Sequence, residues 1–106
     1  MSRLKRNKPV ECADGFRMSV QANDGAYCVP RCNYADRYIE VEIGFPNMKE
    51  ELLMQFAEDP DKPTETVYPY VPSEMVYLVI AKHGGMVGGE LPKGIPCPKE
   101  WNNEAV

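Results

Sequence analysis

The 106-residue chain has a single histidine, a single tryptophan and no long apolar run. No segment approaches the roughly 20 apolar residues of a membrane-spanning helix. The basic N-terminus is followed by Pro9, Glu11 and Asp14 rather than by the apolar core of a signal peptide. We therefore expect a soluble protein in a reducing cytoplasm, where its four cysteines stay as thiols.

Recognisable motifs for catalysis, metal binding or phosphate binding are also lacking. The glycines of HGGMVGG (83–89) follow a predicted helix end, whereas a phosphate-binding loop precedes a helix. Cys28 and Cys32 have the spacing of a ligand pair, but structural zinc sites usually bring a second close pair. We expect no enzyme, no cofactor and no metal, and a Cys- or zinc-dependent module is the third alternative.

Charge is unevenly distributed along the chain. The formal net charge is −4, yet the first eight residues carry four positive side chains, which leaves 8 basic against 16 acidic side chains, or −8, for the remainder. These four residues are Arg3, Lys5, Arg6 and Lys8. Phosphate neutralisation supplies most of the affinity of general nucleic-acid binding, so an acidic body argues against that function. We expect residues 1–9 to be a basic, solvated N-terminal arm.

The segment 66–85 contains the clearest strand and the clearest helix. Valines and tyrosines alternate over 66–71, which indicates a half-buried strand, and Pro69 places that strand at a sheet edge or at a bulge. Pro72 suits the first position of a helix, and Gly84 suits the left-handed residue that closes one. The predicted apolar stripe of this helix contains Met75, Val76, Val79, Ile80 and His83, widened by Leu78.

Alternation and turn residues predict the other elements. Strands are expected over 16–22 and 39–45, with the turn Asn23-Asp24-Gly25 leading into a returning hairpin strand at 26–29. Asn47 and Glu50 match a capping box, which predicts a three-turn helix ending before Pro60. A short strand is expected at Met86-Val87, and Trp101 is expected to anchor the tail.

Together these elements predict an α+β fold: a small antiparallel or mixed sheet of three to five strands with two helices packed on one face. The expected domain organisation is the arm at 1–9, a single α+β domain at 10–87 and a Gly/Pro-rich C-terminal tail at 88–106.

Tyrosines and arginines interleave around the predicted strands. They are Tyr27, Tyr34, Tyr38, Tyr68 and Tyr70 with Arg17, Arg31 and Arg37. Ordinary packing on a sheet surface is one interpretation. Recognition is the other, because Tyr and Arg dominate binding hot spots and Arg forks onto phosphates.

The phrases ECADGFRMSVQA, YCVPR, VEIGFP and TVYPYVPSEMVYLVIAKHGG, which together extend over 11–85, resemble a family of short tailed-phage (bacteriophage) proteins. The resemblance implies a viral accessory gene that acts in the cytoplasm of a host bacterium. It transfers no catalytic or binding residue.

The leading hypothesis is a non-enzymatic phage accessory protein that antagonises host defence. It would bind and sequester a small nucleotide signal at pockets between protomers of a homo-oligomer. The candidate ligand-binding residues are Arg31, Arg37 and Lys82 as cations, Tyr68 and Tyr70 as stacking partners, and His83.

The alternative is a protein-protein inhibitor of a host defence or metabolic enzyme. It would dock through an acidic face on a basic patch of that enzyme. The acidic face would consist of Glu40, Glu42, Glu50, Glu51 and Glu58.

Overall fold

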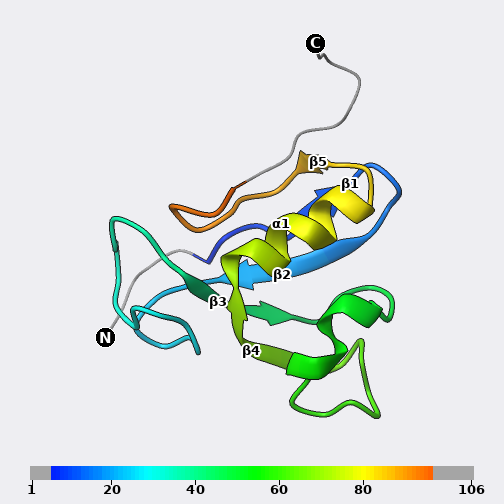
Figure 1. Cartoon of the computed structure of the whole chain (residues 1–106), viewed down its shortest axis with the longest axis horizontal. Helices are drawn as coiled ribbons and strands as arrows, with labels where there is room; N and C mark the ends of the chain where they lie inside the picture. Colours follow the sequence, from blue (N-terminus) through cyan, green and yellow to red (C-terminus); the bar gives the residue numbers. More distant parts are fainter. Residues whose placement is uncertain (1–5, 97–106) are drawn as a thin grey trace.

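The computed structural model describes residues 6–96, and its centre is a five-stranded antiparallel sheet in the order β4-β3-β2-β1-β5 (Figure 1). The elements are β1 (Val10–Cys12), β2 (Arg17–Gln21), β3 (Glu40–Gly44), the 3₁₀ helix η1 (Glu51–Phe56), β4 (Val67–Pro72), α1 (Ser73–Lys82) and β5 (Met86–Gly88). α1 and η1 both contact β4 and each other. The predicted α+β class is confirmed.

The strand β2 has both of its edges occupied, by β1 on one side and by β3 on the other. The predicted hairpin strand at 26–29 is wrong, because only Val29 forms an isolated bridge, to Glu40. The partner on the other edge is β1, a three-residue strand that the sequence pattern does not predict. Met18 and Val20 are buried, whereas Arg17 and Ser19 lie on the other face of β2, as alternation requires.

The strand β4 lies at the edge of the sheet and carries a bulge. Between the paired positions Val41–Val71 and Ile43–Tyr68, β3 has one residue and β4 has two, Pro69 and Tyr70. Tyr70 adopts a left-handed backbone with φ of +55°, and its N–H donates to the carbonyl of Tyr27 (3.1 Å). Pro69 cannot donate a ladder hydrogen bond, and it lies in an edge strand and within a bulge. Both of the alternatives predicted from Pro69 are therefore confirmed.

The helix α1 lies along one face of the sheet and buries Val76, Val79 and Ile80 (Figure 1). Pro72 is the residue that precedes the helix rather than its first residue. Leu78 is 49% exposed, so the prediction that it widens the buried stripe is wrong. Gly84, with φ of +93°, follows the last turn as expected for a glycine that ends a helix.

The predicted three-turn helix after Asn47 is a 3₁₀ helix of six residues instead. Asn47 does not cap it: its side chain accepts from the Arg17 N–H (2.9 Å) and donates to the Gly15 carbonyl (2.9 Å). Glu50 is the capping residue, and its carboxylate accepts from the Leu52 N–H (2.8 Å). The capping box fails because the Asn47 side chain bonds to Arg17 and Gly15, and Glu50 takes the capping position itself.

The described parts of the two terminal segments pack on the domain. Glu90 and Lys8 are joined by two hydrogen bonds, one between their backbones (3.2 Å) and one from the Lys8 N–H to the Glu90 carboxylate (2.8 Å). Ile95 is buried. Residues 88–96 therefore extend the domain instead of starting a separate tail, while Arg3, Lys5, Cys97 and Trp101 lie outside the described residues.

Candidate functional site

The six predicted ligand-binding residues do not converge on one site. Tyr68 is in the core, Tyr70 and Arg31 lie beside Tyr27, and Lys82 and His83 belong to a cluster of charges. Arg37 lies beside Gly94, where an added Cβ would come within 2.7 Å of Arg37 Cγ. The structure thus divides the predicted surface into four places.

Tyr68 is a core residue and is not available to stack on a ligand. Its side chain is fully buried, and its hydroxyl donates to the Pro63 carbonyl (2.6 Å). Burial raises the pKa of this hydroxyl. Alternation predicted a half-buried strand here, but the inward face of that strand includes Tyr68, so its assignment as a stacking partner is corrected.

Tyr70, Tyr27 and Arg31 form a small exposed cluster. The two tyrosine rings lie 5.9 Å apart at an angle of 46°, and the Arg31 guanidinium lies 5.3 Å from the centre of the Tyr27 ring. These contacts already use one face of Tyr27 for a cation–π interaction. The roles of Arg31 and Tyr70 in ligand binding stay predictions.

His83 lies at the centre of the charge cluster. Its Nδ1 is 2.6 Å from Asp14 Oδ2, and its Nε2 is 2.6 Å from Glu50 Oε1. The other oxygen of Glu50 accepts from Lys82 Nζ (2.7 Å). The Phe16 ring stacks on the imidazole, with 4.1 Å between the ring centres and 12° between the planes.

The hydrogen bonds of the cluster lower the pKa of both of its carboxyl groups. Burial raises the pKa of Glu50, but hydrogen bonds from Lys82, from the Leu52 N–H and from His83 outweigh burial and lower it. Burial acts in the same way on Asp14, where hydrogen bonds from the Phe16 N–H and from His83 lower the pKa. Each ring nitrogen of His83 thus lies against a carboxylate whose pKa the cluster lowers.

This cluster joins the turn after β1, the start of η1 and the end of α1. Both ring nitrogens of His83 are engaged by these carboxylates. The sequence pattern placed His83 at a helix end but gave no sign of its partners. Glu50 was assigned to an acidic face, which is wrong, since the residue is 2% exposed and pairs with His83 and Lys82.

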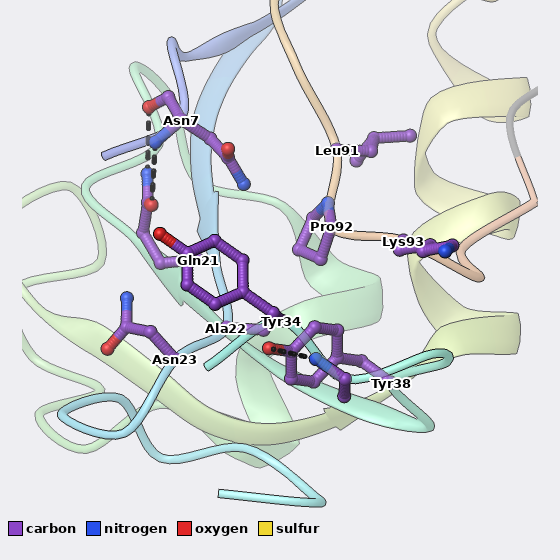
Figure 2. A pocket seen from close by; sticks show the side chains of 10 residues that line it. Asn7, Gln21, Ala22, Asn23, Tyr34, Tyr38, Leu91, Pro92 and Lys93 are labelled. Atoms are coloured by element: carbon purple, nitrogen blue, oxygen red, sulfur yellow. Dashed lines mark hydrogen bonds between the residues drawn. The ribbon is translucent and has the colours of Figure 1, made fainter. Parts of the chain in front are cut away.

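A pocket of about 300 Å³ opens where the end of β2 meets the loop at 34–38 and the segment 91–93 (Figure 2). Asn7 and Gln21 form one wall and are joined by two hydrogen bonds, both 2.9 Å. Tyr38 forms the opposite wall; its hydroxyl donates to the Cys32 carbonyl (2.6 Å) and accepts from the Ala35 N–H (3.2 Å). The walls are thereby fixed by hydrogen bonds.

Two amide side chains at this pocket have unused hydrogen-bonding groups. Asn7 Nδ2 donates to the Val20 carbonyl (3.2 Å), but within residues 6–96 its Oδ1 has no partner. Asn23 Oδ1 accepts from the Gly25 N–H (2.8 Å), and its Nδ2 has no partner in the same range. Figure 2 shows the Asn7 amide pointing into the space between Tyr34 and Pro92. One acceptor and one amino group are therefore available to a ligand.

Tyr34 stands at the pocket with its ring beside Gln21 (Figure 2). The residue is 82% exposed, and its backbone is left-handed, with φ of +58°. A non-glycine residue in this conformation is uncommon, costs on the order of 1–3 kcal/mol, and such residues cluster at functional sites. An aromatic ring is thus held in solvent at a cost to stability.

Positive charge lies at the rim of the pocket. Lys93 extends away from the cavity in Figure 2, and its carbonyl accepts from the Tyr38 N–H (3.0 Å). Arg37 packs on Gly94, the next residue along the chain. Neither cation forms an ion pair with another described residue; Lys93 lines the pocket, whereas Arg37 is not among the lining residues.

The described cysteines do not gather at this site. Cys28 is buried, and its thiol donates toward the carbonyls of Asn23 (3.3 Å) and Pro30 (3.4 Å), whereas Cys32 is exposed. Over residues 6–96, no three His, Cys, Asp or Glu side chains are placed to hold a metal ion.

No protein-family model matches the chain, and comparison with curated proteins and with solved structures finds no significant match. Within the described range, none of the helices has the length and apolar character required to cross a membrane.

Proposed function

We propose that the chain is a non-enzymatic binding protein for a small nucleotide, whose base enters the pocket beside Tyr34. The observation that carries this proposal is the Tyr34 ring, exposed on a left-handed backbone at a pocket that two amides with unused groups also line. A volume of about 300 Å³ is at the lower end of the roughly 300–1,000 Å³ found for ligand sites, which fits one base.

Base recognition is assigned to the aromatic and amide groups. A planar base stacks on Tyr34, an interaction that tolerates any base because each has a π-face. The acceptor of Asn7 and the amino group of Asn23 then contact the base edge, where the donor and acceptor pattern differs between bases. The pocket therefore favours a base with adjacent donor and acceptor groups, such as adenine or guanine.

Phosphate recognition is assigned to the rim. Lys93 and Arg37 have no ion-pair partner among residues 6–96, and an anion in an acidic protein requires such local cations. Of the six residues predicted from the sequence, Arg37 is the one that stays in the proposed site. The others are replaced by Tyr34, Asn7, Asn23 and Lys93.

The biological role in this proposal is sequestration of a nucleotide signal by a phage accessory protein in the cytoplasm of its host. The proposed binding role does not involve His83, whose ring nitrogens are both engaged by carboxylates within the fold. The pocket is formed within one chain, so the proposal does not require the homo-oligomer expected from the sequence.

Isothermal titration with a panel of mononucleotides, cyclic nucleotides and ADP-ribose tests the proposal. At least one member should bind, and Tyr34→Asn should weaken its binding by about tenfold or more, because base stacking contributes roughly 1–3 kcal/mol. Asparagine tolerates a left-handed backbone, so this variant removes the ring without forcing the loop to change. Lys93→Gln should weaken binding less at high salt than at low salt.

Lys62→Gln is the matched charge control, because Lys62 lies in the loop after η1, away from the pocket. It should leave the affinity unchanged. The proposal is overturned if no member of the panel binds, or if Tyr34→Asn and Lys62→Gln have the same effect on a ligand that does bind.

A further inference from the structure

A second hollow, of about 270 Å³, lies beside β2 and the end of β3. It is lined by Arg17 and Ser19 of β2, by Gly44 and Phe45 at the end of β3, and by Arg6. Arg17 and Ser19 alternate with Met18 and Val20, which are buried on the α1 side. Pro9 and the core residue Met18 also line the hollow, which has no lining residue in common with the nucleotide pocket.

Both arginines of this hollow lack an acidic partner. In the part of the chain from residue 6 to residue 96, neither Arg6 nor Arg17 forms an ion pair. The cross-strand neighbour of Arg17 is Glu11, but the Glu11 carboxylate lies beside Gly88, 3.5 Å from where a Cβ would be. Two guanidinium groups without partners, in a chain with a net charge of −4, form a local site for an anion.

Ser19 adds a hydrogen-bond donor to the two arginines. Its Oγ accepts from Gln21 Nε2 (3.0 Å). Because this oxygen already accepts one hydrogen bond, its own proton is available to a ligand oxygen. The three groups together provide two planar forks and one hydroxyl, which is the donor set that phosphate and carboxylate oxygens accept from.

Phe45 adds an apolar surface to the same hollow. The residue is 58% exposed and adopts a left-handed backbone with φ of +49°, and its N–H is held by the Thr66 carbonyl (3.0 Å). A large exposed ring in this conformation lowers the stability of the fold. We therefore infer that the Phe45 ring has a functional role. The position of Phe45 next to the arginines indicates a ligand with an apolar part as well as a charge.

We propose that this hollow is a binding site for a small organic oxyanion, in which a phosphate or carboxylate group is attached to a flat apolar group. The oxyanion contacts Arg6, Arg17 and the Ser19 hydroxyl, and the apolar group packs on Phe45. The proposal is independent of the nucleotide pocket, since the two sites have no lining residue in common.

Phenyl phosphate is the probe, and its titration is followed by the amide chemical shifts of the ¹⁵N-labelled chain. We expect saturable shifts at Arg17, Ser19 and Phe45. Inorganic phosphate, which lacks the ring, and benzyl alcohol, which lacks the charge, should each bind at least about tenfold more weakly. Shifts that do not saturate, or that centre on Tyr34 and Lys93, overturn the proposal.

Variants test whether phenyl phosphate binds at this hollow or is attracted to positive charges on the surface in general. Arg17→Gln and Arg6→Gln should each lower the affinity for phenyl phosphate about tenfold or more, and both side chains are exposed, so folding is retained. Phe45→Asn should also weaken binding while it keeps a residue that tolerates φ of +49°.

The two proposals fail separately in these experiments. Tyr34→Asn removes the ring that stacks on the base in the nucleotide proposal. This variant should leave the affinity for phenyl phosphate unchanged. Lys62→Gln removes the same charge as Arg17→Gln at a distant place and should have no effect. Equal losses from Arg17→Gln and Lys62→Gln would overturn the second site and leave the nucleotide proposal unaffected.

Discussion

The carboxylate of Glu50 lies 2.6 Å from Nε2 of His83, and both residues are buried, although they come from different elements of the chain. Glu50 precedes η1 and caps it, whereas His83 follows α1. Their contact fixes the position of η1 relative to α1. Lys82 and Asp14 complete the cluster, because Lys82 contacts the other oxygen of Glu50 and Asp14 contacts the other ring nitrogen of His83.

Removal of the Glu50 charge should destabilise the fold strongly. Glu50→Gln leaves His83 with one carboxylate instead of two and removes the buried partner of Lys82, and loss of one partner of a buried ion pair costs about 3–5 kcal/mol. Lys82→Met removes the outer partner, whose side chain is 48% exposed, and should cost about 1 kcal/mol or less. Urea unfolding of the two variants measures the difference. Equal costs would mean that the Glu50–His83 contact contributes little.

The pH dependence of stability should follow the same carboxylates. The pKa of Glu50 and that of Asp14 are lower in the folded state than their ordinary values, so the unfolded state takes up protons first as the pH falls. Stability is then complete above the ordinary carboxyl pKa of about 4 and decreases as the pH falls through the folded-state pKa values. Unfolding by urea between pH 7 and pH 3 measures this decrease.

The groups that face Glu50 are Lys82 and His83 of the α1 end and the Leu52 N–H of η1, and Asp14 faces His83 from the other side. In Glu50→Gln the slope of stability against pH below pH 4.5 should be smaller than in the unchanged chain, because one of the two carboxylates no longer titrates. An unchanged slope would show that other carboxyl groups control acid unfolding.

Local patterns in the sequence predict the parts of the fold that depend on neighbours in the chain. Alternation predicts the strand with Val41 and Ile43, periodicity predicts the buried face of α1, and Pro69 predicts a bulge at an edge. Contacts between distant residues are not encoded in such patterns. For this reason β1 was missed, since its three residues form a strand only by pairing with β2 and β5.

The candidate site was less predictable than the fold for the same reason. The pocket proposed to bind a nucleotide combines the N-terminal segment, the end of β2, the loop at 34–38 and the segment 91–93. Tyrosine and arginine content pointed to recognition, but not to which residue is exposed. Tyr34, Phe45 and Tyr70 are exposed aromatic residues with left-handed backbones, and nothing in an aromatic residue type indicates a positive φ.

Tyr68→Phe should distinguish a core role from a ligand-binding role for this tyrosine. Loss of the hydrogen bond to the Pro63 carbonyl should lower the free energy of unfolding by about 1 kcal/mol. The affinity for any nucleotide found by titration should stay unchanged, because the side chain is fully buried. A loss of affinity without a loss of stability would restore Tyr68 to the binding site.

Gly89 should be required for the attachment of the segment after β5 to β1. It has φ of +98°, and a Cβ there would lie 2.1 Å from the Pro9 carbonyl oxygen and 2.6 Å from Val10 Cα, both of them backbone atoms. Gly89→Ala therefore combines the cost of a left-handed L-residue, about 1–2 kcal/mol, with a backbone clash that adds about 1–3 kcal/mol.

Gly15 provides the matched control for this prediction. Its φ of +96° is nearly the same, but nothing lies within 4 Å of an added Cβ, so Gly15→Ala should cost about 1–2 kcal/mol from the backbone alone. Urea unfolding gives both costs, and hydrogen exchange of the Glu90 amide, which donates to the Lys8 carbonyl, reports the segment directly. Exchange at Glu90 should accelerate in Gly89→Ala and not in Gly15→Ala. If the two variants lose equal stability and exchange stays slow in both, the contact between Gly89 and the Pro9 backbone does not hold this segment in place.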